Sequence, residues 1–129
     1  MPQAEGKALV FASTDTIDTA VLETFPYEGV EQEIACETNE FSAVCPFSGL
    51  PDLATVRVVY VPSDRCVELK SLKYYYLSFR NVGIYQEHAT DRILRDLAAL
   101  LKPKRLTVET DYNVRGGIHT VCRAEYRSE

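Results

Sequence analysis

The stretch from Cys45 to Asp52, Cys-Pro-Phe-Ser-Gly-Leu-Pro-Asp, places a thiol and a carboxylate on either side of a rigid turn. A deprotonated thiol is a nucleophile and a nearby carboxyl group can transfer protons, so this pair could carry out covalent and acid–base chemistry. Two prolines and one glycine within the stretch exclude a helix interior or a central strand. The alternative is that Cys45 is a buried, inert thiol and Asp52 a turn residue, since both are common.

The flanking sequence indicates that this turn joins two strands. Residues 37–44 before it and 53–61 after it alternate in polarity or are rich in β-branched residues, a pattern typical of strands. We expect one long strand over 30–44, which a bulge could interrupt, with Ile34, Cys36 and Thr38 on one face. Its antiparallel neighbour is expected over 53–61, followed by a turn at 62–64.

The remaining sequence changes from helical to strand periodicity. Apolar residues recur at helical spacing over 69–79, and a second helix is expected over 85–101, stopped by Pro103. Strands over 105–111 and 118–126 are joined through residues 113–117, whose paired glycines permit a tight hairpin. Residues 14–24 are ambiguous, and residues 1–12 carry little pattern.

The order of these elements predicts an α+β fold, with two consecutive helices on one face of a four-stranded antiparallel sheet, ββααββ. The two helices place these apolar residues on their buried faces: Leu69, Leu72, Tyr76 and Phe79 in the first, and Ile93, Leu94, Leu97, Leu100 and Leu101 in the second.

Composition limits the class of protein. A chain of 129 residues with 46% hydrophobic residues is expected to form one domain, residues 1–129. The net charge of −5 argues against a general electrostatic grip on nucleic acid. No apolar run reaches the roughly 20 residues that span a bilayer and no signal peptide is visible, so we expect a cytoplasmic protein. The four cysteines are then expected to be reduced, and without a Cys-x-x-Cys pair no metal site is predicted.

Several separated motifs, in unbroken order from about residue 39 to 118, carry a family resemblance. They are Cys45-Pro46…Gly49…Pro51-Asp52, Glu68-Leu69-Lys70-Ser71-Leu72-Lys73-Tyr74-Tyr75, Ser78-Phe79-Arg80-Asn81, Gln86-Glu87 and Arg115-Gly116-Gly117-Ile118. Together they resemble the short, single-domain form of the queuosine-pathway nitrile reductases, the QueF family, which has the tunnelling fold. The stretch from Glu68 to Tyr75 distinguishes these reductases from the related type I GTP cyclohydrolases.

The resemblance implies an activity and an assembly. The activity is reduction of 7-cyano-7-deazaguanine to 7-aminomethyl-7-deazaguanine with two NADPH, in biosynthesis of a modified tRNA base. The assembly is a homo-oligomer, with subunits joined edge to edge into rings and each active site shared between neighbours. No direct contact with nucleic acid or membrane is implied.

The resemblance also implies roles for the residues of each motif. Cys45 is the candidate nucleophile, forming a thioimide with the nitrile carbon, and Asp52 the general acid that protonates the nitrile nitrogen. Glu87 is expected to accept hydrogen bonds from the N–H edge of the base, because a carboxylate accepts two such bonds at once. Gln86 stands where the family often has His, and His88 follows Glu87. A second substrate contact, from a neighbouring subunit, is implied for Val67, Glu68 and Leu69, although Glu68 could simply begin a helix.

Cofactor phosphates need cations here, because no Gly-x-Gly-x-x-Gly follows a strand. Lys70 and Lys73 are one helical turn apart and Arg115 lies in the glycine hairpin. The family resemblance implies that these three are the contacts to NADPH. By spacing alone the lysines would be a solvated helix face.

Two rival functions remain at this point. One is an amidine-forming relative that uses the same cysteine on the nitrile of a tRNA base but takes ammonia instead of hydride; the predicted cofactor cations argue against it. The other is a non-catalytic pterin- or purine-binding protein of the tunnelling fold, against which the intact pair of Cys45 and Asp52 argues. Ring size and the roles of Cys36, Cys66 and Cys122 stay open.

Overall fold

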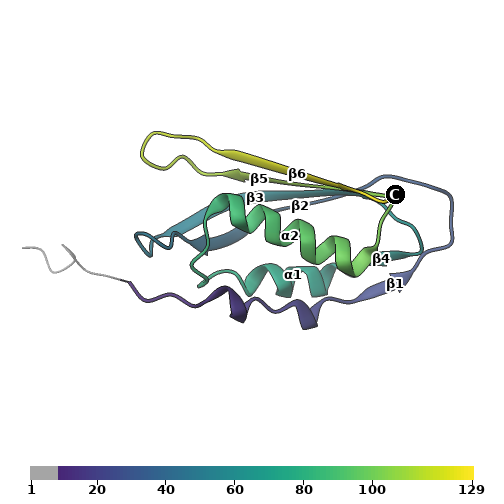
Figure 1. The fold of residues 1–129 in the computed structure, drawn as a ribbon, viewed down its shortest axis with the longest axis horizontal. Coiled ribbons are helices and arrows are strands. Elements are labelled where there is room, and N and C mark those ends of the chain that lie inside the picture. Colours follow the sequence, from purple (N-terminus) through teal and green to yellow (C-terminus); the bar gives the residue numbers. More distant parts are fainter. Residues whose placement is uncertain (1–8) are drawn as a thin grey trace, which may run out of the picture.

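The computed structural model describes residues 9–129, and its main feature is a four-stranded antiparallel sheet with helices over one face (Figure 1). The strands lie in the order β2-β3-β5-β6, so β2 and β6 are the two edges. A separate two-stranded sheet pairs β1 with β4. In chain order the elements are β1 (Thr24–Pro26), β2 (Ile34–Val44), β3 (Pro51–Val61), β4 (Arg65–Val67), α1 (Leu69–Leu77), α2 (Gln86–Leu101), β5 (Arg105–Tyr112) and β6 (Val121–Arg127), preceded by 3₁₀ turns at Thr14–Thr16 and Thr19–Val21.

A bulge in β2 decides which side chains of that strand face the helices. Thr38 pairs with Val56 and Phe41 with Ala54, so β2 contains one residue more than β3 between these pairs. Side chains alternate between the two faces of a strand, and one extra residue therefore reverses the alternation. Before the bulge Cys36 and Thr38 share the half-buried face, and after it Phe41 and Ala43 are buried at 1% exposure.

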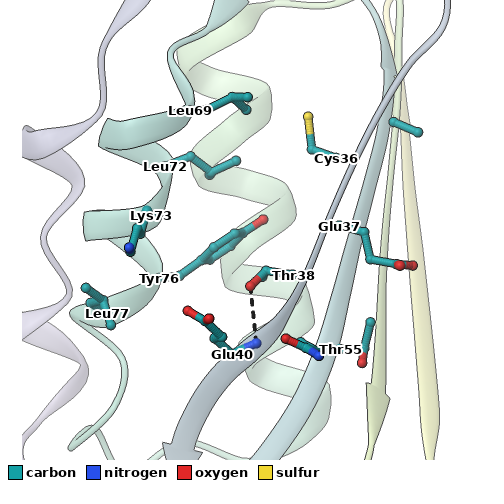
Figure 2. Close-up of a pocket in the computed structure, with 12 residues that line it drawn as sticks. Cys36, Glu37, Thr38, Glu40, Thr55, Leu69, Leu72, Lys73, Tyr76 and Leu77 are labelled. Carbon is teal, nitrogen blue, oxygen red and sulfur yellow. Dashed lines mark hydrogen bonds between the residues drawn. The ribbon is translucent and has the colours of Figure 1, made fainter.

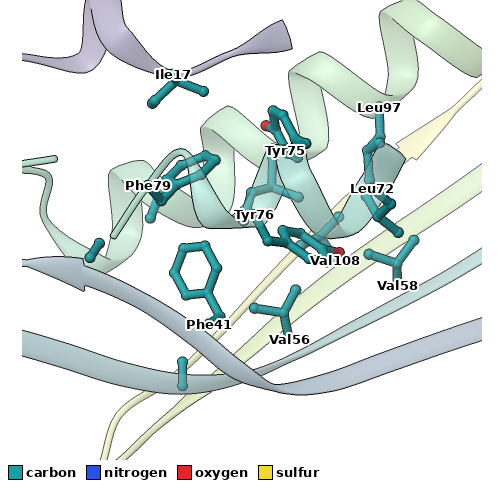
Figure 3. Packing of buried hydrophobic residues seen from close by; sticks show 14 of the residues in the cluster. Ile17, Phe41, Val56, Val58, Leu72, Tyr75, Tyr76, Phe79, Leu97 and Val108 are labelled. Carbon is teal, nitrogen blue, oxygen red and sulfur yellow. The ribbon is translucent and has the colours of Figure 1, made fainter. Parts of the chain in front are cut away.

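The helices cover the sheet through apolar side chains at helical spacing. Ile93, Leu97 and Leu101 of α2 have no exposed surface, and α2 packs on β5 and β6 while α1 packs on β2. The Phe41 ring lies 5.2 Å from that of Phe79, so aromatic residues fill the space between α1 and β2 (Figure 3). α2 ends where Lys102 adopts a left-handed conformation, directly before the helix-stopping proline.

The predicted ββααββ order is confirmed, with local differences. The long strand begins at Ile34, not at residue 30, and its expected bulge is present. Leu69 is 60% exposed, so it does not belong to the buried stripe of α1. The ambiguous residues 14–24 form two short 3₁₀ turns and enter β1. β1 and β4 were not predicted, because strands of three residues are too short to show a period.

The two ends of the sheet carry different groups (Figure 1). The turn between β2 and β3, the β5–β6 hairpin and the first turn of α2 lie at one end, whereas β4 and the first turn of α1 lie at the other. Val67 is at the second end, since its N–H donates to the Tyr60 hydroxyl at 3.1 Å. The strand steps from Asp52 to Tyr60 span roughly 26 Å at about 3.3 Å per residue.

Candidate active site

Cys45 opens a closed turn directly after β2. Its N–H donates to the Leu50 carbonyl at 2.9 Å, and its carbonyl accepts from the Gly49 N–H at 2.7 Å. Gly49 has φ of +72°, a left-handed conformation that glycine adopts without steric cost. The proline and glycine of the motif therefore close a tight loop around the thiol.

The thiol of Cys45 lies in surroundings that favour its thiolate. Cys45 is 6% exposed, and burial alone would raise the pKa of its thiol. Backbone hydrogen bonds from Ser48 and Phe47, the Ser48 hydroxyl and the positive charge of Arg115 outweigh burial, so the pKa is lowered. A thiolate is the reactive form of cysteine, and N–H groups with a nearby guanidinium are typical of reactive thiols.

Asp52 lies on the same face of the sheet as Cys45. It is the second residue of β3 and pairs with Ala43, two residues before Cys45, so the two side chains are diagonal neighbours. Asp52 is 5% exposed, and its Oδ1 accepts a hydrogen bond from Nη1 of Arg115 at 2.7 Å. A thiol, a carboxylate and a guanidinium from three segments of the chain thus meet at one end of the sheet.

The hairpin that presents Arg115 is held by its own backbone. Arg115 and Ile118 exchange N–H···O hydrogen bonds, each of 3.0 Å, across Gly116 and Gly117. Both glycines have positive φ, 59° and 79°, which is the requirement of the two-residue turns that fit the twist of a hairpin. The paired glycines therefore place Arg115 over the β2–β3 turn.

Gln86 and Glu87 start α2 beside the Cys45 turn. Residues 82–84 run along the end of β2, where the Val44 N–H donates to the Val82 carbonyl and the Ile84 N–H to the Val44 carbonyl, both at 3.0 Å. Gln86 is 8% exposed and Glu87 is exposed. This short ladder brings the first turn of α2 next to Cys45.

A buried tyrosine lies within electrostatic range of both Asp52 and Glu87. Tyr112 ends β5, is 2% exposed, and burial raises the pKa of its phenol. The negative charges of Asp52 and Glu87 raise that pKa further, so both carboxylates act on the same hydroxyl. Sequence reasoning missed Tyr112 and also Ser48, which hydrogen-bonds to the thiol. The available signal for Ser48 was a serine three residues after a cysteine in a turn.

Val67, Glu68 and Leu69 do not join this cluster within one chain, because they lie at the other end of the sheet. The Glu68 carboxylate caps α1, accepting from the N–H groups of Lys70 and Ser71 at 2.8 Å each. This is the helix-start role considered above for Glu68. Its role in binding a substrate stays a prediction, as do those of Val67 and Leu69.

Lys70 and Lys73 lie on the exposed side of α1, away from the Arg115 ion pair with Asp52. Lys73 lines a cavity of about 800 Å³ between α1 and β2, into which Leu72 and Tyr76 also point (Figure 2). Among the ion pairs formed by residues 9–129, none involves Lys70 or Lys73. Lys73 is therefore an available cation at a cavity large enough for a phosphate-bearing group, and Lys70 lies one helical turn away on the exposed side of α1. The expected cluster of both lysines with Arg115 is not formed within one chain.

Residues 9–129 contain no group of three or more His, Cys, Asp or Glu side chains arranged to hold a metal ion. No helix formed by these residues is long and apolar enough to cross a membrane.

Comparison with known proteins identifies the family. A family model described as QueF-like protein matches residues 51–129. A protein of Thermotoga maritima, named NADPH-dependent 7-cyano-7-deazaguanine reductase, is 56% identical over 124 residues, which cover 95% of this chain and 90% of that protein. The chain belongs to the QueF family. A QueF relative of the same name from Caldicellulosiruptor bescii is 54% identical over 114 residues, covering 87% of each chain.

A solved structure supports the predicted fold. The archaeosine synthase QueF-Like in its apo form matches with a TM-score of 0.68, covering 80% of this chain and 99% of that chain. The two sequences are only 20% identical, so this similarity concerns the fold alone. The predicted tunnelling fold is confirmed.

Proposed function

We propose that this member of the QueF family reduces the nitrile of 7-cyano-7-deazaguanine to an aminomethyl group with NADPH. The observation that carries the proposal is the cluster of Cys45, Asp52 and Arg115, which combines a thiol of lowered pKa with a buried carboxylate. Relatives up to 56% identical bear the name of this activity. We also expect residues 1–129 to form one cytoplasmic domain.

The first step is addition of the Cys45 thiol across the nitrile. The sulfur bonds to the nitrile carbon, one C–N π bond breaks, and the nitrogen gains a proton, giving a thioimide. The Asp52 carboxylate, held by Arg115, can take the thiol proton and deliver it to that nitrogen, so no charge accumulates on the substrate. NADPH, when bound, supplies hydride, and the four-electron reduction uses two NADPH and two protons per nitrile.

Recognition of the base is assigned to the first turn of α2. Glu87 is exposed there and can accept two hydrogen bonds from the N–H edge of a guanine-like base, while Gln86 can both donate and accept. Thr90 supports this turn, since its hydroxyl donates to the Gln86 carbonyl at 2.9 Å. The exposed Glu87 and the buried Cys45 would then hold opposite ends of a flat substrate.

The second substrate contact requires another subunit. Val67, Glu68 and Leu69 lie roughly 26 Å along the sheet from Asp52, too far for one small molecule to reach. The edges β2 and β6 have unpaired backbone groups that suit edge-to-edge assembly. Exposed apolar side chains flank the Cys45 cluster, among them Phe47 at 90% and Ile118 at 68% exposure. We therefore assign each active site to two neighbouring chains of a homo-oligomer, with Lys70 and Lys73 of the neighbour meeting the cofactor phosphates.

The deciding experiment mixes protein, 7-cyano-7-deazaguanine and NADPH and follows loss of reduced-nicotinamide absorbance. We expect two NADPH consumed per aminomethyl product, measured by mass spectrometry. Consumption of ammonia without NADPH, giving an amidine, would instead assign the chain to the amidine-forming activity. Binding of the nitrile with neither product would leave a non-catalytic binding protein and overturn the proposal.

A further inference from the structure

Residues 9–12, here called the strap, cross the active-site end of the molecule. The Ala12 N–H donates to the Asn81 carbonyl at 2.7 Å, and the Gly83 N–H donates to the Ala12 carbonyl at 2.9 Å. The strap thus adds a parallel bridge to residues 82–84, on the side opposite to Val44. Three segments far apart in sequence form one short ladder, whose last member leads directly into Cys45.

The strap passes close to two glycines, Gly49 and Gly83. A Cβ on Gly83 would overlap the ring of Phe11. A Cβ on Gly49 would lie 2.9 Å from Cβ of Leu9 and 3.1 Å from the Leu9 carbonyl oxygen. A side chain at either position would force the strap to move, so each glycine permits its close approach. Leu9 therefore packs on the Cys45 turn, and Phe11 packs on the segment that leads into α2.

We propose that the strap is a positioning element of the active site, which holds the Cys45 turn against the segment that carries Gln86 and Glu87. Apart from the hydrogen bonds to the sulfur, the turn is held by the two backbone hydrogen bonds at Cys45 and one from the Leu50 N–H to the Ser48 hydroxyl at 3.2 Å. With the strap in place, the groups of Phe47 and Ser48 stay directed at the sulfur. The effect on thiol reactivity is independent of the reaction catalysed, whereas the effect on turnover depends on the proposed function.

The consequence for the thiol follows from its surroundings. The hydrogen bonds from Ser48 and Phe47 lower the pKa of Cys45 against the effect of burial, and Arg115 is the charged group that adds to them. Asp52 pairs with Arg115, whereas the backbone hydrogen bonds of the strap go to Asn81 and Gly83. Loosening the turn weakens the hydrogen bonds to the thiolate and leaves the desolvation, so the pKa of Cys45 must rise.

The test compares Phe11→Ala with Val10→Ala. Val10 lies in the same strap but is 93% exposed, against 37% for Phe11, so it is the matched control. Alkylation by iodoacetamide is followed as a function of pH, and Cys45 is resolved from Cys122 of β6 by peptide mass spectrometry. In Phe11→Ala we expect the midpoint for Cys45 to move to higher pH, with that of Cys122 unchanged, and kcat to fall about 10- to 100-fold with little change in KM for NADPH. Phe11→Leu, which keeps an apolar contact, should restore most of both.

A second comparison uses the overlap at Gly83. Gly83→Ala must displace Phe11 and should reproduce the shift in Cys45 reactivity, whereas adding Gly83→Ala to Phe11→Ala should change nothing further. Additive effects of the two substitutions would overturn the proposal. So would a Phe11→Ala variant that has a lower melting temperature but wild-type alkylation and kcat, or a Val10→Ala variant with an equal shift. If the wild type does not reduce the nitrile, the proposed function fails, and the alkylation profiles still decide the role of the strap.

Discussion

Replacing Asp52 with Asn separates the proton-transfer role of this carboxylate from its structural role. The amide keeps the size of the side chain and one oxygen acceptor for Arg115, which donates to Oδ1 at 2.7 Å, but it cannot carry a proton from sulfur to nitrogen. Loss of general acid–base catalysis costs about 10²–10⁴ in rate, or about 2.7–5.5 kcal/mol in the barrier. We expect kcat to fall by that factor.

The expected loss of stability in Asp52→Asn is much smaller. A charge-assisted hydrogen bond becomes a neutral one, and because Arg115 is 48% exposed, solvent already screens much of its charge. We expect a cost of about 1 kcal/mol, well below the about 5–15 kcal/mol that stabilises a typical domain. Thermal unfolding should therefore show a folded variant with a slightly lower melting temperature.

The assay follows NADPH oxidation together with alkylation of Cys45. Removing the negative charge of Asp52 leaves Arg115 free to stabilise the thiolate, so alkylation should stay at the wild-type rate or rise while turnover is lost. Asp111→Asn is the control, because Asp111 on β5 is 52% exposed and pairs with His119 at 2.6 Å. Wild-type turnover in Asp52→Asn, or an equal loss in Asp111→Asn, would refute the assignment of Asp52.

Four further outcomes are expected. The nitrile added without NADPH should increase the intact mass of the wild type by one substrate molecule, and Cys45→Ala should bind the nitrile without any mass increase. Arg115→Ala removes a positive charge that lowers the pKa of Cys45, so the midpoint of Cys45 alkylation should move to higher pH. The thiolate fraction at neutral pH should then fall. A midpoint at or below that of the wild type would show that Arg115 does not stabilise the thiolate. Lys70→Ala should raise KM for NADPH with little change in kcat, and equal use of NADH and NADPH by the wild type would remove Lys70 and Lys73 from the cofactor site. Mixing inactive Cys45→Ala subunits with inactive Leu69→Asp subunits should recover activity, because some shared sites then contain both intact residues. Light scattering verifies that mixed oligomers form. No recovery of activity in such oligomers would place each site within one chain.

Much of the fold follows from local patterns in the sequence. The apolar residues of α2 recur every three or four positions and are buried at Ile93, Leu97 and Leu101. The helix ends before Pro103 and the hairpin turns at Gly116 and Gly117, because these residue types restrict or release the backbone wherever they occur. The motifs around Cys45, Glu68 and Glu87 were sufficient to indicate the family.

Contacts between distant segments could not be read in this way. Which lysine or arginine shares a site depends on the direction of each element, and Arg115 pairs with Asp52 while Lys70 lies on α1. The three-residue strands β1 and β4 form only because they pair with each other. Their pairing energy comes from tertiary contact, not from local propensity.

The face of the sheet on which Cys45 lies shows most directly which features follow from the sequence and which from the tertiary structure. The sequence by itself determined that a cysteine ends a strand at a rigid turn, since proline and glycine dictate that local geometry. Only the tertiary structure decided that Cys45 shares a face of the sheet with Asp52, because the extra residue between Thr38 and Phe41 reverses the alternation of β2. A one-residue change of register turns every later side chain to the other face of the sheet, and register is set by pairing with β3.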